Sequence, residues 1–100
     1  MNKANARAAI DRIEKLIEYF GYPNAQALSE IKNLLLALAR SRFLDAYFRE
    51  KIGSAGIWAE IGFSVRKFKK YPGGVDQVKG WALNDISSAR SQIERNWPNE

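Results

Sequence analysis

The 100-residue sequence contains no cysteine and no histidine. Without cysteine there is no disulfide, no thiolate metal site and no cysteine nucleophile, and this composition suits a reducing compartment. Histidine is the usual general base near neutral pH and the commonest metal ligand, so transition-metal sites and Ser–His or Cys–His pairs are excluded. Only carboxylate or lysine chemistry remains open. We therefore expect neither an enzyme nor a cofactor.

Long hydrophobic runs are also missing. The longest, Leu34–Ala39, is far shorter than the roughly 20 residues that span a bilayer. The first 12 residues mix charged side chains with alanines, and so they lack the apolar core of a signal peptide. We expect a soluble, cytoplasmic protein that does not enter a membrane.

The sequence does contain apolar residues at helical spacing. Residues 4–20 carry one apolar stripe, and Gly21 followed by Pro23 is a helix stop signal. Asn24 is the predicted cap of a second helix over residues 25–40. Because the connection is short, these two helices should pack antiparallel as a hairpin.

The middle of the chain allows more than one assignment. Ser41 is a candidate cap for a shorter helix over residues 42–52, although residues 25–52 could also form one kinked helix. The run Gly53-Ser54-Ala55-Gly56 predicts a flexible break. Residues 57–71 then fit a helix with Ile57, Trp58, Ile61, Val65 and Phe68 on one face, or a strand. We favour the helix, because no second strand is evident to pair with.

A turn at Tyr71-Pro72-Gly73-Gly74 leads into the last predicted helix, which Asp76 can cap and which extends to about Asn96. Three long helices and one or two short ones can enclose one core without a metal or disulfide. The sequence therefore predicts an all-α single domain over residues 1–100, an antiparallel helical bundle of four to five helices.

The net charge of +5 favours an anionic partner. Four cations in five residues are interleaved with aromatics in Arg66-Lys67-Phe68-Lys69-Lys70-Tyr71, as in a patch that contacts phosphate. The alternative is a solvated helix face whose Phe68 enters the core. No helix-turn-helix, zinc-finger or RNP motif supports nucleic-acid binding, and a membrane-surface helix is disfavoured because the apolar stripes are needed to close the core.

The sequence also contains three tryptophans, and one leucine lies off the apolar stripe of its helix. Trp81 lies off the stripe of its helix, so it is either a partly exposed interface residue or is covered by a loop such as residues 71–74. Trp58 is expected in the core, with a partner-facing loop as the alternative, and Trp97 is expected to pack the C-terminal end. Leu36 points away from its stripe and needs a neighbour from this fold or another chain.

The acidic residues give no sign of a metal site. Asp11, Glu14 and Glu18 project from the polar side of the first helix, where Asp11 can pair with Lys15. Such a face is ordinarily solvated, so we predict no metal and no acid–base pair. Gly73-Gly74 lacks the following Lys-Ser/Thr of a phosphate loop.

The order of elements resembles that of a known protein family. A helical hairpin is followed by Phe43-Leu44, by the stretch Ile52-Gly53-Ser54-Ala55-Gly56-Ile57-Trp58-Ala59-Glu60-Ile61-Gly62, and by a closing helix. This is similar to small all-helical bacterial immunity proteins of toxin-delivery loci, including contact-dependent inhibition and polymorphic-toxin loci. The resemblance implies a cytoplasmic inhibitor that occludes a cognate toxin domain and has no catalysis. Many such proteins are acidic, whereas this chain is basic, so its toxin surface should be acidic or the contact chiefly apolar.

The leading hypothesis is therefore a toxin-neutralising immunity protein. Its predicted partner-binding residues are the anchors Tyr71 and Trp81 and the charged residues Arg66, Lys67, Lys69 and Lys70. The alternative is a small basic nucleic-acid-binding accessory protein that places residues 66–71 on phosphate. A third hypothesis is a homo-oligomeric bundle that associates through Leu36 and Trp81; the sequence is compatible with a monomer or a homodimer.

Overall fold

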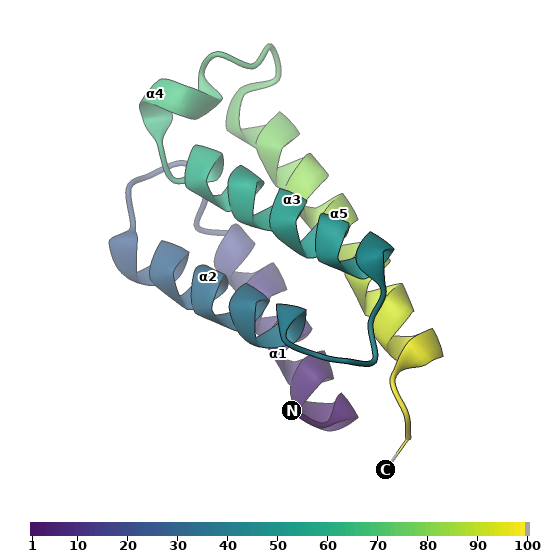
Figure 1. Ribbon diagram of the computed structural model, residues 1–100. Coiled ribbons are helices and arrows are strands. Elements are labelled where there is room, and N and C mark those ends of the chain that lie inside the picture. Colours follow the sequence, from purple (N-terminus) through teal and green to yellow (C-terminus); the bar gives the residue numbers. More distant parts are fainter. Residues whose placement is uncertain (100) are drawn as a thin grey trace.

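The computed structural model describes residues 1–99, and within them it contains helices and no strand (Figure 1). Four helices are long: α1 (Lys3–Ile17), α2 (Ala25–Ala39), α3 (Ala46–Gly62) and α5 (Gly74–Asn96). The fifth, α4 (Val65–Phe68), is a single short turn. The radius of gyration, 13.3 Å, is that expected of a compact chain of this length. The all-α prediction is confirmed.

Each long helix packs against two others. α1 contacts α2 and α5, and α3 also contacts α2 and α5. All four contribute large, fully buried side chains to one core: Ile10, Ile13, Ile17, Ile31, Leu38, Phe48, Val78, Ile86 and Ile93. The short helix α4 lies at the end of the molecule opposite both termini (Figure 1). It is therefore held by the ends of α3 and α5 and is free on its outer side.

The predicted cap of the second helix is confirmed. The Asn24 side chain accepts a hydrogen bond from the Ala27 N–H at 3.0 Å and caps α2. α1 ends at Ile17, earlier than predicted, and the chain continues as a turn to Phe20. Gly21 then adopts φ +120°, which favours glycine, and its N–H donates to the carbonyl of Gly62 at 2.9 Å. The hairpin turn is thus tied to the end of α3.

The predicted break at Gly53–Gly56 is wrong, because α3 runs without interruption through both glycines. Each glycine weakens a helix by about 1 kcal/mol relative to alanine. This loss is offset by burial of one face of α3, which carries Phe48, Ile52, Ala55 and Ala59. Here tertiary packing overrides the local turn signal.

The predicted cap at Ser41 is also wrong. Ser41 lies in the loop between α2 and α3, where its hydroxyl oxygen accepts from the Phe43 N–H at 3.1 Å. The cap is Asp45, whose carboxylate accepts from the Phe48 N–H at 3.0 Å. α2 and α3 are therefore separate helices, not one kinked helix.

Residues 57–71 contain helix and no strand, as favoured, but they do not form one helix. α3 ends at Gly62, and α4 begins after Phe63 and Ser64. Asp76 does not cap the last helix, since α5 starts at Gly74 and places Asp76 in its first turn, where a carboxylate is favourable to the helix dipole. The sequence alone did not reveal this early start, because Gly73 and Gly74 signal a turn.

Candidate binding surface

The predicted cationic tract forms an exposed corner around α4. Arg66, Lys67, Lys69 and Lys70 are all exposed, while Phe68 between them is half-buried and packs against the core. Backbone hydrogen bonds from the N–H groups of Lys67 and Phe68 to the carbonyl of Ser64 form the turn. Phe68 thus anchors the tract, and its four cations face outward.

These four cations differ from many others in the molecule. Arg7, Arg12, Lys32 and Arg90 all make close ion pairs with carboxylates on neighbouring helices. Among residues 1–99, no ion pair involves any of the four cations around α4. Their positive charge is therefore available to an anionic partner.

One carboxylate of the chain itself lies near the cationic tract. Glu60 pairs with Lys32, and this hydrogen bond holds the pKa of Glu60 below its ordinary value of 4.5. Lys67 makes a smaller electrostatic contribution in the same direction. Lys67 therefore has an acidic neighbour that is already engaged by another lysine.

An aromatic cluster lies beside the cations and consists of Trp58 from α3, Tyr71 from the turn after α4, and Trp81 from α5. The Trp58 and Trp81 ring centroids are 4.7 Å apart, and Tyr71 meets Trp81 edge-on at 5.5 Å. Trp81 remains 37% exposed. Tyr71 and Trp58 thus cover part of the Trp81 ring, and the rest of this side chain is exposed.

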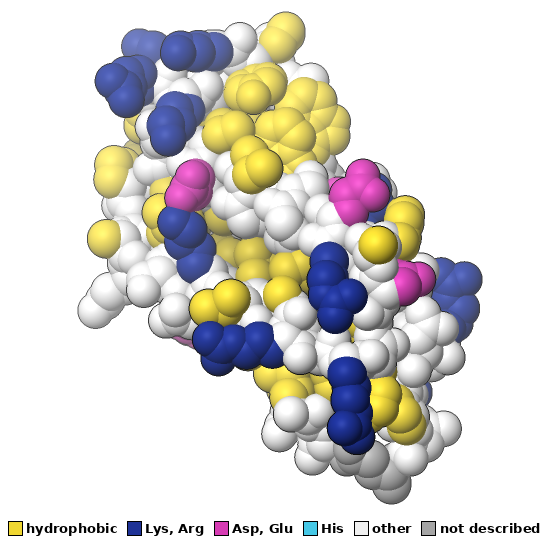
Figure 2. Space-filling model, in the orientation of Figure 1, with side chains coloured by type: hydrophobic (Ala, Val, Ile, Leu, Met, Phe, Trp, Pro, Cys, Tyr) yellow, Lys and Arg dark blue, Asp and Glu magenta, His cyan; other side chains and the backbone are white. Residues whose placement is uncertain are grey.

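Apolar side chains extend the aromatic cluster toward the cations. Ile57 on α3 is 59% exposed. A hollow of about 470 Å³, lined by Ile61, Lys67, Lys70 and Tyr71, lies one helical turn further along. Figure 2 shows Lys and Arg side chains gathered next to an apolar patch at this end of the molecule. We call the aromatic cluster, Ile57, this hollow and the four cations the α4 surface.

Most of the predicted contact residues meet at the α4 surface. Lys67, Lys70 and Tyr71 line the same hollow, and Tyr71 touches Trp81. Arg66 and Lys69 belong to the same corner but do not line the hollow. Sequence reasoning did not select Ile57 and Ile61 as contact residues. The sequence analysis placed Ile57, Trp58 and Val65 on one face, and this is wrong: Ile57 is 59% and Val65 44% exposed, whereas Trp58 packs against the core. Neighbouring residues of a helix point in different directions, so Ile57 faces outward where Trp58 faces inward.

Trp97 and Leu36 lie away from the α4 surface. Trp97 is buried, as expected. Leu36 is 53% exposed and lines an open groove between α2 and α3 together with Leu35, Ile52, Gly53 and Gly56. It therefore points away from its own stripe, as predicted. No predicted contact residue other than Leu36 lines this groove.

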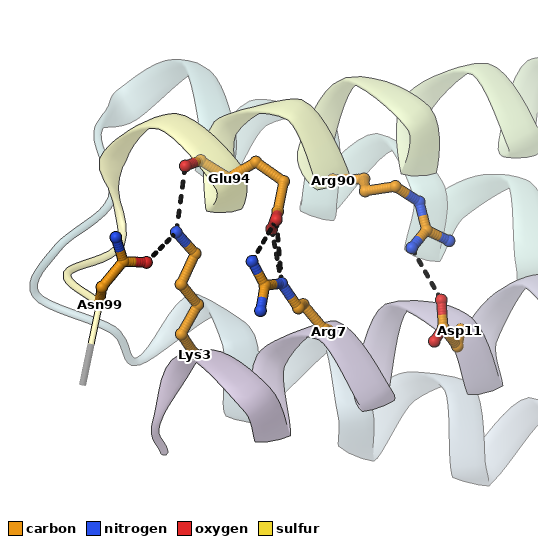
Figure 3. A network of polar contacts seen from close by, with 6 residues as sticks. All are labelled: Lys3, Arg7, Asp11, Arg90, Glu94 and Asn99. Atoms are coloured by element: carbon orange, nitrogen blue, oxygen red, sulfur yellow. Dashed lines mark hydrogen bonds and ion pairs between the residues drawn. The ribbon is translucent and has the colours of Figure 1, made fainter.

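The acidic face of α1 is part of the contact with α5. Arg90 of α5 donates to Asp11 at 2.7 Å and to Glu14 at 2.5 Å, so the expected pairing of Asp11 with Lys15 is wrong. Figure 3 shows the neighbouring contacts, in which Arg7 pairs with Glu94 and Lys3 reaches the C-terminal end of α5. These acids hold helices together, and residues 1–99 contain no group of three potential metal ligands.

Comparisons with other proteins give no further guide to the site. Within the part of the chain that the structure describes, no helix is both long and apolar enough to cross a membrane. The chain matches no protein-family model, no curated protein and no solved structure. Any functional conclusion therefore depends on the chemistry of the α4 surface itself.

Proposed function

We propose that this protein is a non-catalytic inhibitor of the immunity type, which binds a toxin domain of its own bacterium through the α4 surface. The observation that carries the proposal is the juxtaposition of four unpaired cations with a partly exposed aromatic cluster. Protein interfaces commonly combine an apolar, aromatic centre with a polar or charged rim. The partner surface should be acidic around an apolar patch.

The arrangement of the rings favours a protein partner over nucleic acid. Stacking of bases requires free ring faces, whereas Trp58, Tyr71 and Trp81 pack chiefly against one another. Next to Trp58 on α3, aliphatic Ile57 is exposed, which suits an apolar protein contact. Nucleic-acid binding is still the second candidate, because the four cations could also neutralise phosphates.

The proposal includes an antiparallel arrangement of the long helices as a rigid support. Such a bundle would hold the ends of α3 and α5 in fixed positions, and the α4 surface is built on those ends. A rigid surface loses little conformational entropy when it binds. Inhibition would then follow from occlusion of the toxin's active site, with no reaction on this chain.

Co-expression in bacteria tests the proposal. The toxin-like product of the adjacent reading frame is expressed with the wild-type chain or with Trp81→Ala, and growth and binding of the two purified proteins are measured. We expect protection by the wild type. Loss of Trp81 should weaken binding by about 2 kcal/mol or more, as at interface hot spots.

Leu36→Ala is the matched control, because Leu36 is exposed but lies in the α2–α3 groove, away from the α4 surface. Circular dichroism verifies that both variants stay folded. Equal binding by wild type and Trp81→Ala would contradict the proposal, as would an adjacent product that this chain does not neutralise. Steeply salt-dependent, micromolar binding of random duplex or single-stranded RNA would instead support the nucleic-acid alternative.

A further inference from the structure

The hollow at the junction of α3 and α4 has a composition distinct from that of the rest of the tract. Its four lining residues are one aliphatic side chain, Ile61, two lysines, Lys67 and Lys70, and one tyrosine, Tyr71. The lysines are three residues apart, which is close to one turn along the chain. Both are exposed, and neither takes part in an ion pair among residues 1–99.

The walls of the hollow are fixed by the fold. Ile61 is half-buried and packs on the core. Tyr71 is held at one side by edge-on contacts with Trp58 at 6.0 Å and Trp81 at 5.5 Å. The two lysine side chains are exposed, so an entering group would meet a fixed apolar floor beside two solvated ammonium groups.

We propose that this hollow is the subsite for one glutamate side chain of the protein partner. The two methylenes of glutamate would lie on Ile61, and the carboxylate would accept hydrogen bonds from the ammonium groups of Lys67 and Lys70. This inference rests on the proposed function and identifies the part of the partner that is recognised.

A carboxylate suits the hollow better than a phosphate. Ile61 gives the hollow an apolar floor beside the two lysines. A glutamate side chain can cover this floor with its methylene groups while its carboxylate reaches the ammonium groups, whereas a phosphate group has no apolar part to place there. Glu60 does not offset the two lysines, because it is already paired with Lys32.

Nuclear magnetic resonance titration of the ¹⁵N-labelled full chain tests the subsite with a tetraglutamate peptide whose ends are blocked. We expect saturable shifts of the amide signals of Ile61, Lys67, Lys70 and Tyr71. Lys67→Ala and Lys70→Ala should each weaken binding by roughly three- to fivefold, the upper range for an exposed ion pair. Arg66→Ala and Lys69→Ala are matched controls, because they remove the same charge without lining the hollow, and they should change affinity by less than about twofold.

Three results would overturn the subsite: absence of saturable binding, equal weakening by all four substitutions, or tighter binding of inorganic phosphate or oligouridylate RNA at the same amides. Equal weakening would mean that the tract acts only through its total charge. If the Lys67→Ala and Lys70→Ala chains bind the toxin as tightly as the wild type does, the subsite is wrong and the immunity function stands. If the wild-type chain does not neutralise the toxin, the immunity function is wrong, whether or not the tetraglutamate peptide binds.

Discussion

Asp85 is the one acidic side chain that the structure buries among residues 1–99. One of its carboxylate oxygens has no hydrogen-bond partner, and the other lies 3.9 Å from the ammonium group of Lys51. The same ammonium group is 5.2 Å from the ring centroid of Tyr47. A buried acceptor without a partner costs about 1–3 kcal/mol, and a single distant ammonium compensates only part of the desolvation of a charge.

We therefore expect Asp85→Asn to raise the free energy of unfolding by about 1 kcal/mol at neutral pH, because it removes a poorly paired buried charge with little change in volume. Urea denaturation followed by circular dichroism measures the effect. Glu50→Gln, an exposed neutralisation on α3 that breaks no ion pair, should leave stability nearly unchanged. A lower stability of Asp85→Asn would show that the attraction between Lys51 and Asp85 outweighs the burial cost.

At the scale of the element, α3 shows what local sequence rules can and cannot predict. The sequence shows the helical period of the apolar residues in α3, and it also shows the cap of α2 at Asn24. The sequence does not show that α3 continues through Gly53 and Gly56, because this continuity depends on packing against α2 and α5. The cationic tract could be found from composition. Which of its lysines share a hollow with Ile61 depends on the turn at Phe63 and Ser64, which no local pattern indicated.

The glycines of α3 provide a matched pair of substitutions. A Cβ atom on Gly62 would overlap the buried ring of Phe20, whereas one on Gly53 would meet nothing within 4 Å. We expect Gly62→Ala to lower the free energy of unfolding by about 1–3 kcal/mol through overpacking. Gly53→Ala should raise it by up to about 1 kcal/mol, because alanine is the better helix former. Both are measured by urea denaturation, and equal effects would contradict the packing at Phe20.

At the scale of the whole molecule, ion pairs join each pair of packed long helices. Arg7–Glu94 and Arg90–Asp11 link α1 to α5, Arg12–Glu30 links α1 to α2, Lys32–Glu60 links α2 to α3, and Lys51–Asp85 links α3 to α5. Most of these side chains are substantially exposed, so each pair stabilises the fold only slightly. Three of them, Arg7–Glu94, Arg12–Glu30 and Lys32–Glu60, also make the stability of the fold depend on pH.

Hydrogen bonds from Arg12, Lys32 and Arg7 hold the pKa values of Glu30, Glu60 and Glu94, respectively, below the ordinary 4.5. A carboxyl with a lowered pKa in the folded state stabilises it above the unfolded pKa, and this contribution is lost as pH falls through the folded value. The melting temperature should therefore fall between about pH 5 and pH 3, and less steeply in 1 M salt. Calorimetry at a series of pH values measures the melting temperature. Glu94→Gln should make the melting temperature change less with pH. A melting temperature that does not change with pH would contradict the lowered pKa values of these carboxyl groups.

The contacts of Lys3 have a practical consequence for work on this protein. Its ammonium group donates to the carbonyl of Glu94 at 3.1 Å and to the side chain of Asn99 at 2.9 Å, so the beginning and the end of the chain lie together, far from α4 (Figures 1 and 3). Attachment of the protein to a sensor chip or bead through either end would leave its cationic corner facing the solution. Capture experiments can thus use the same orientation whichever end carries the tag.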